Sequence, residues 1–145
     1  YLVINDLENN SKFSKNLVVV EEPELSLYPT IQKEILEFII LKIRNSKSKL
    51  IITTHSPYIL ASLDNLIQAY NTNVQTAKLK KSYISKIIDE KLWINFDAVE
   101  SYYFTGGVAN ETLDHEFKNI GTSNIDDVSI KIADEYESLL DLKYN

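Results

Sequence analysis

The sequence contains no cysteine and no methionine, and each absence narrows what the chain can be. Without cysteine it can form neither a disulfide framework nor a thiolate metal site. Because position 1 is Tyr1 rather than methionine, we expect the chain to be a fragment or an excised domain of a longer protein. Its 145 residues suit a single domain, and an apolar fraction of 44% is sufficient for a core.

Long apolar runs and net positive charge are also absent. No run approaches the roughly 20 apolar residues that a membrane helix needs. The first residues lack the pattern of a signal peptide, so we expect a cytoplasmic protein with no membrane partner. The net charge is −6, from 15 basic and 21 acidic residues, which argues against a broad phosphate-backbone footprint. The only basic cluster, KLKKSYISK at residues 78–86, is interpreted as a solvated surface.

Part of the chain has the pattern of a βαβ unit with a parallel sheet. Two short runs rich in β-branched residues, 17–21 and 50–54, predict strands buried on both faces. Between them, apolar residues recur at helical spacing over residues 30–44. Residues 65–70, with the sequence NLIQAY, predict a third strand.

Shorter signals complete the organisation of this first part. Residues 1–16 begin apolar and become polar, which predicts the end of a helix followed by a loop. Ser56 is a plausible N-cap for a short helix, with Pro57 at the first helical position.

The pattern changes from about residue 72 onward. Residues 99–117 predict a β-hairpin with Gly106 and Gly107 in the turn. Residues 124–142 predict a closing amphipathic helix, with apolar residues at 125, 128, 132, 136 and 139. We therefore expect a small α+β extension at the carboxyl end of the same domain.

Acidic residues and a histidine follow the two predicted parallel strands. Glu21 and Glu22 end the first strand, where Pro23 stops the ladder, and His55 follows the second strand. Because ligands in open α/β sheets bind outside the carboxyl ends of strands, we expect these residues at one rim. One carboxylate can hold Mg²⁺, usually through water, while a second deprotonates the attacking water and a histidine contacts the terminal phosphate.

Simpler interpretations remain for each feature alone. Acidic residues after a strand are often only solvated, and a lone histidine is more often structural than catalytic. The two features together, at matching strand ends, favour a functional site. A glycosidase is disfavoured, because its two carboxylates face each other across roughly 5–9 Å of cleft and sequence neighbours do not do so easily.

The two strand ends carry a family resemblance. LVVVEEPELSLYP followed by LIITTHSPYIL resembles the carboxyl-terminal half of an ABC-type ATPase domain. The likeness is greatest to the overcoming-lysogenization-defect (OLD) family and related RecF- and SMC-like AAA ATPases. It implies an α/β, P-loop-NTPase-like fold, with a parallel-sheet lobe over residues 1–71 and the extension over residues 72–145.

The resemblance implies a role for each site residue. Glu21 matches the Mg²⁺-associated acid of the Walker B motif, Glu22 the catalytic glutamate and His55 the switch histidine. Nucleotide contacts are implied for three further residues: Glu24, Ser26 and Thr54.

Residues 23–29 match the D-loop, which in this family meets the partner subunit of an ATP-sandwich homodimer. Two positions depart from the family pattern. Glu21 stands where ABC proteins in general have aspartate, and Tyr28 stands where the OLD-like branch commonly has histidine.

The phosphate-binding half of such a site is missing from this sequence. A phosphate loop needs G-x-x-x-x-G-K-S/T, and none of the three glycines starts that motif. No SGGQ-like signature is present. We therefore expect Mg²⁺ and ATP to bind in the complete protein and this chain to be inactive alone. The sequence also has no D-x-D motif, so no Toprim nuclease is assigned.

Two functions from different classes follow. In the first, the chain is the Walker B, D-loop and switch-histidine part of an ATPase, with a DNA or defence-system partner implied by the resemblance. In the second, it is a non-catalytic interaction module, in which residues 72–145 bind a partner and the ATPase-like part is a scaffold.

Overall fold

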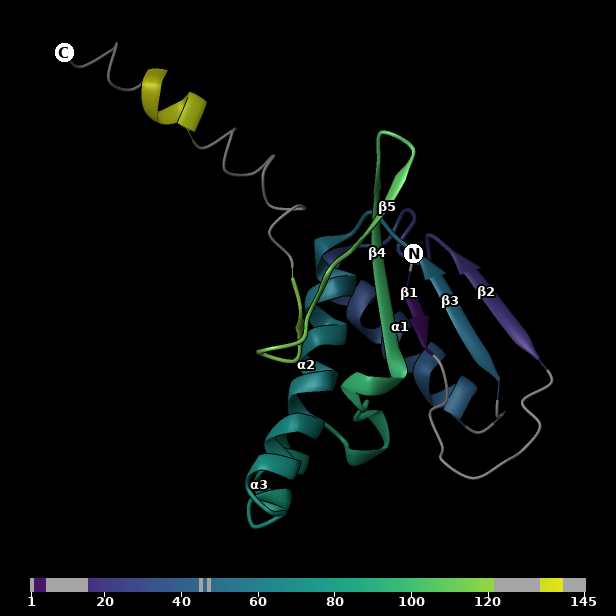
Figure 1. Ribbon diagram of the computed structural model, residues 1–145, viewed down its shortest axis with the longest axis vertical. Coiled ribbons are helices and arrows are strands. Elements are labelled where there is room, and N and C mark those ends of the chain that lie inside the picture. Colours follow the sequence, from purple (N-terminus) through teal and green to yellow (C-terminus); the bar gives the residue numbers. More distant parts are fainter. Residues whose placement is uncertain (1, 5–15, 45, 47, 122–133, 140–145) are drawn as a thin grey trace.

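The computed structural model describes residues 2–4, 16–44, 46, 48–121 and 134–139 of the chain (Figure 1). Among these residues, one sheet has the strand order β2-β3-β1-β4-β5. Its strands are β1 (Leu2–Ile4), β2 (Leu17–Glu21), β3 (Lys49–Thr53), β4 (Val99–Thr105) and β5 (Val108–Glu111). The helices are α1 (Pro29–Arg44), α2 (Pro57–Gln75) and α3 (Lys81–Ile87), with short 3₁₀ turns at Glu90–Leu92 and Phe96–Ala98. A separate two-stranded ladder joins β6 (Leu113–Asp114) to β7 (Asn119–Ile120).

The predicted β–α–β unit is confirmed. β2 and β3 are parallel neighbours, in a register that sets Val18 opposite Leu50 and Glu21 opposite Thr53. α1 connects them and covers one face of the sheet. The parallel pairing is limited to β2 and β3, because β1 pairs antiparallel with both β3 and β4, and β5 pairs antiparallel with β4. The sheet is therefore mixed.

Two predicted elements were wrong. Residues 2–4 form a strand rather than the end of a helix, and residues 5–15 lie outside the described part. Residues 65–70 belong to α2 rather than to a strand. Leu63, Leu66 and Ile67 are all buried, at the spacing of one helical face, so this apolar run continues the buried stripe of α2. Short apolar runs fit a strand or a buried helix equally well, and the packing decides.

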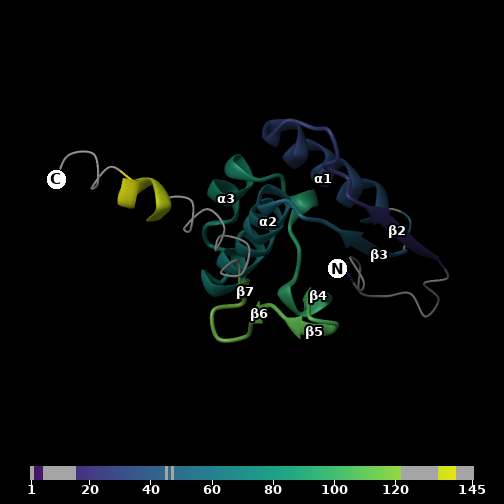
Figure 2. The same cartoon turned by 90° about the horizontal axis from the view of Figure 1, so that it is seen from above.

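The core lies between the sheet and its helices. Figure 2 shows α1 and α2 on the same side of the sheet. Leu50 and Ile52 of β3 face this side and are fully buried. The same core also contains residues from the carboxyl-terminal part of the chain: Leu92, Ile94, Phe96, Val99 and Ile120. α2 itself runs without interruption past residue 71. The two parts of the chain thus share one core.

The opposite face of β2 is open among the described residues. Leu17 and Val19 are more than half exposed, whereas Val18 and Val20 pack against the core. The expectation that this strand is buried on both faces was therefore wrong. A continuous apolar run predicts two buried faces, but the described helices supply a cover for only one.

The predicted hairpin is confirmed, and it extends beyond the rest of the sheet (Figure 1). Gly106 and Gly107 form its turn with φ of 57° and 80°, values that glycine adopts without steric cost. Of the predicted closing helix, residues 124–133 and 140–142 lie outside the described residues, and residues 134–139 are helical. None of the described helices combines the length and apolar character needed to cross a membrane.

The two faces of the sheet predict different responses to truncation. Ile52→Ala should lower the free energy of unfolding by about 2–5 kcal/mol, because it leaves a cavity under α1 and α2. Val19→Ala on the open face should cost less than about 1 kcal/mol. Urea unfolding followed by circular dichroism measures both values. Equal losses for the two variants would show that the face bearing Val19 is covered.

Candidate functional site

Glu22 and His55 come together at the carboxyl ends of two parallel strands. The amide of Glu22 donates to the carbonyl of Thr53 at 2.8 Å, which carries the β2–β3 pairing one residue past the strand. This register brings His55 Nε2 to 3.4 Å from Glu22 Oε1, as the predicted shared rim requires. The side chain of His55 is 89% exposed and that of Glu22 is 43% exposed. Both groups are therefore accessible to a ligand.

The backbone of Glu22 adopts an unusual conformation. Its φ is +43°, in the left-handed region that non-glycine residues seldom enter, at a cost of about 1–2 kcal/mol. Pro23 follows directly and restricts this residue further. The amide of Leu25 then donates to the carbonyl of Glu22 at 2.9 Å, closing a tight turn. This turn lets Glu22 leave the strand direction and reach His55, and strain of this kind is typical of functional sites.

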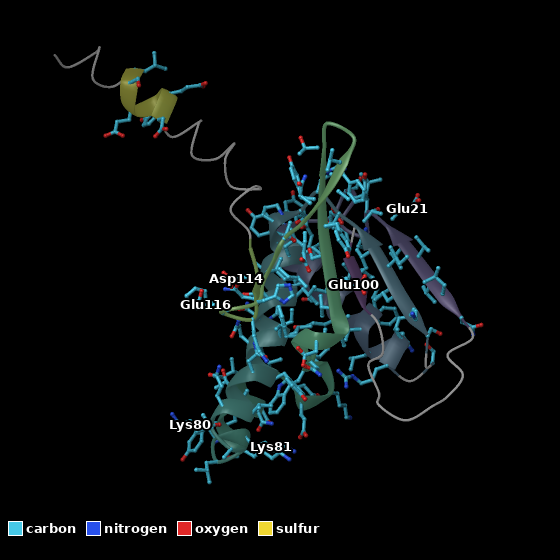
Figure 3. All side chains as sticks on the ribbon, viewed as in Figure 1. Glu21, Lys80, Lys81, Glu100, Asp114 and Glu116 are labelled. Atoms are coloured by element: carbon cyan, nitrogen blue, oxygen red, sulfur yellow. The ribbon has the colours of Figure 1, made fainter. Side chains whose placement is uncertain are left out.

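Glu21 lies on the same rim but does not join the Glu22–His55 contact. By strand alternation it shares the open face of the sheet with Leu17 and Val19, and Figure 3 shows it at the end of β2. Its carboxylate is exposed and makes no hydrogen bond or ion pair with any described residue. It is therefore available to an ion or to water.

The described residues do not form a metal site by themselves. No three acidic or histidine side chains in that part of the chain are grouped closely enough to hold an ion. Magnesium usually keeps several waters and binds through one or two carboxylates plus substrate phosphates. Glu21 fits this kind of site, in which most ligands come from water and nucleotide.

Glu24 joins the two strand ends. Its Oε1 accepts a hydrogen bond from the Thr54 hydroxyl at 2.6 Å and another from the His55 amide at 2.8 Å. Its other oxygen, Oε2, is buried without a hydrogen-bond partner among the described residues. The Thr54 hydroxyl also accepts from the Ser56 amide at 3.0 Å. Glu24 and Thr54, which the resemblance assigns to the nucleotide, thus bind each other and fix the backbone beside His55.

A second hydrogen-bonded link, in which Gln32 joins Ser56 to Leu27, was not predicted from the sequence. Ser56 caps α2 as predicted, accepting from the amides of Tyr58 and Ile59, and its hydroxyl donates to Gln32 Oε1. Gln32 Nε2 in turn donates to the carbonyl of Leu27 at 2.9 Å. The spacing of α1 could have indicated that Gln32 is buried. Gln32 begins the buried stripe of this helix, which continues through Leu36, Ile40 and Ile43.

The segment after the acidic pair exposes apolar side chains. Leu25 and Tyr28 are 70% and 83% exposed, respectively. Ser26 is exposed as well, with a φ of 62°. No described residue hydrogen-bonds to its side chain. This segment therefore presents an apolar surface next to Glu22 and His55.

Comparison with protein families identifies the same region. Residues 12–61, about a third of the chain, match a family described as an AAA domain, putative AbiEii toxin, type IV TA system. No curated protein and no solved structure matches the chain. The matched residues contain the whole Glu22–His55 rim. This part of the chain is thus similar to an AAA-type domain, a kind of domain that binds nucleotide.

The Glu24 bridge predicts a selective effect on His55. Glu24→Ala removes the acceptor of two hydrogen bonds and should cost about 1–3 kcal/mol of stability. Amide hydrogen exchange at His55 should accelerate by roughly tenfold or more, because the His55 N–H loses the Glu24 carboxylate as its hydrogen-bond acceptor. Glu24→Gln keeps one carbonyl oxygen and should have a smaller effect on both quantities.

The matched control is Glu21→Ala, which removes a carboxylate from the same rim without touching the bridge. It should leave exchange at His55 unchanged. Exchange in Glu24→Ala as slow as in the original chain would contradict the bridging role.

Proposed function

We propose that the chain supplies the water-activating half of an ATP-hydrolysing site of the ABC, OLD-like type. One observation carries the proposal: Glu22 lies 3.4 Å from His55 at the carboxyl ends of two parallel strands. In open α/β sheets this edge is where ligands bind. The similarity of residues 12–61 to an AAA-type domain supports the same chemistry.

Glu22 is the proposed general base. Its carboxylate is partly exposed, and its only ion pair or side-chain hydrogen bond among the described residues is with His55. It is thus placed to accept a proton from water as the water oxygen attacks the terminal phosphorus and ADP leaves. The strained backbone of Glu22 holds the side chain at the rim before the nucleotide arrives. Such preorganisation lowers the cost of positioning during the reaction.

His55 is the proposed contact to the terminal phosphate. Its ring is almost wholly exposed, while its amide is fixed by Glu24 at 2.8 Å. The backbone is therefore held while the ring remains accessible. An imidazole so placed can donate a hydrogen bond to a phosphate oxygen and, when protonated, offset its charge.

Glu21 is the proposed Mg²⁺-associated acid, acting through water. Mg²⁺ bound with ATP would offset the charge of the phosphates during transfer. Ser26, exposed beside this rim, remains a candidate nucleotide contact. We assign Glu24 and Thr54 a positioning role, in view of their mutual hydrogen bond.

Two features of the complete site must come from residues outside this sequence. The phosphate loop and the signature motif are absent from the 145 residues, so this chain alone would bind ATP weakly. The exposed Leu25 and Tyr28 fit the proposal that the segment between the acidic pair and α1 meets a second subunit in an ATP-bound homodimer. The OLD-like resemblance also suggests a DNA or defence-related partner for the whole protein.

Three substitutions distinguish the proposed roles. They are compared in the complete protein, in which a phosphate loop accompanies these residues. Glu22→Gln keeps the shape but removes the base, so turnover should fall by about 10²–10⁴-fold with ATP binding largely intact. Glu21→Gln should weaken both Mg²⁺-dependent nucleotide binding and turnover. His55→Ala should lower turnover with a smaller effect on binding, because it removes one contact at the terminal phosphate.

The measurements are nucleotide affinity by calorimetry and steady-state phosphate release. Lys33→Gln, at an exposed ion pair on α1, is the control and should behave like the original chain. Normal turnover in Glu22→Gln would refute the assignment of the base.

A further inference from the structure

The loop before α3 and α3 itself present an apolar surface far from the candidate site. Leu79, Tyr83 and Ile87 are 84%, 68% and 80% exposed, respectively. Tyr83 and Ile87 are one helical turn apart, and Leu79 precedes Tyr83 by the same interval. Exposed apolar surface that is extensive enough often marks a place that another element covers. These three residues, with the lysines described next, are called the α3 surface.

Lysines alternate with these apolar residues along the chain. Lys78, Lys80 and Lys86 are all exposed, and Lys86 Nζ lies 5.8 Å from the ring centroid of Tyr83. Lys81 is already paired with Glu90. Figure 3 places Lys80 and Lys81 at the opposite end of the molecule from Glu21. The α3 surface is therefore basic in a chain of net charge −6, and it is separate from the candidate site.

The carboxyl-terminal helix has the complementary character. Residues 134–139 are helical, and Tyr136 and Leu139 are 64% and 65% exposed. These two apolar residues are three positions apart and so share one side of the helix. The remaining positions of the turn are mainly acidic: Asp134, Glu135 and Glu137. Residues 134–139 are called the acidic helix.

We propose that the acidic helix docks on the α3 surface of the same molecule. Burial of Tyr136 and Leu139 against the apolar residues of α3 would remove both exposed surfaces from water. The carboxylates of the acidic helix would then face the lysines. A tethered segment also has an effective concentration in the millimolar range, so a modest contact suffices. A second copy, a lipid surface or a nucleic acid lacks that advantage.

The connection is long enough for this contact. The Ile120 amide donates to Asp64 Oδ1 at 3.0 Å, and the Asn71 side chain donates to the Lys118 carbonyl at 2.9 Å. The chain is thus held beside α2, which ends about 17 Å beyond Asp64 at 1.5 Å per residue. The residues between Gly121 and Asp134 can span roughly 40 Å when extended. The α3 surface is within that reach.

The composition of the chain allows a clean distance measurement. Trp93 is the only tryptophan and packs with Ile84 of α3, and there is no cysteine. An acceptor dye on Ser138→Cys therefore reports transfer from Trp93 near α3 to the acidic helix. We expect efficient transfer in dilute solution, unchanged on further dilution. Reversing two lysines, Lys80→Glu with Lys86→Glu, should lower the docked population by roughly five- to tenfold, because attractive contacts become repulsive.

Two further variants make the experiment decisive. Adding Asp134→Lys and Glu137→Lys to the double reversal restores opposite charges and should recover the transfer. Lys42→Glu, an exposed lysine on α1, is the matched control and should have no effect. Transfer equal to that of the urea-unfolded chain, or insensitive to the reversal, would overturn the proposal. Transfer that appears only as protein concentration rises would also overturn it, by showing docking between two copies.

Discussion

The parallel pairing of β2 with β3 is the constraint on which the site depends. Its register sets Glu21 opposite Thr53, so the residues that follow each strand emerge at one edge. A shift of one residue would turn every side chain of β2 to the other face. The partly buried Val18 and Val20 face the core, and a shift would place the Glu21 carboxylate there together with Leu17 and Val19, at the cost of burying an unpaired charge. Core packing thus fixes the position of Glu22 relative to His55.

Hydrogen bonds then convert this register into a defined geometry. Glu24 ties the segment after β2 to the backbone after β3, and Gln32 ties the same segment to the Ser56 cap of α2. The bonds of Glu24 to Thr54 and His55, and that of Ser56 to Gln32, join residues 24 to 31 positions apart in sequence, whereas the bond from Gln32 to Leu27 is local. They offset the cost of the left-handed conformation at Glu22. The result is a hydrogen-bonded backbone with two accessible side chains, which is the arrangement that the proposed site needs.

The sequence was sufficient to predict the elements that carry the rim. The β-branched runs, the helical spacing of α1 and the Ser56 cap are local signals that packing did not override. Residues 65–70 were misassigned because a short apolar run fits either a strand or a buried helix. The antiparallel placement of β1 and the open face of β2 depend on which segments pair or pack, which no local pattern specifies. The Glu24 contact was missed for the same reason, because it joins residues whose proximity follows from the register.

The central claim is that Glu22 and His55 meet the phosphates of a metal-bound nucleotide, and paramagnetic NMR tests it most directly. Mn²⁺ replaces Mg²⁺ with ATP, and line broadening is followed at each backbone amide of the chain. The account predicts that signals of Glu22 and His55 broaden first, while those of Lys80 and Glu116, elsewhere on the surface in Figure 3, broaden last. Weak binding suffices, because broadening reports even sparsely populated complexes near the metal. Broadening that begins at Asp114 and Glu116, or that is equal near all exposed carboxylates, would contradict the assignment of this rim as the nucleotide site.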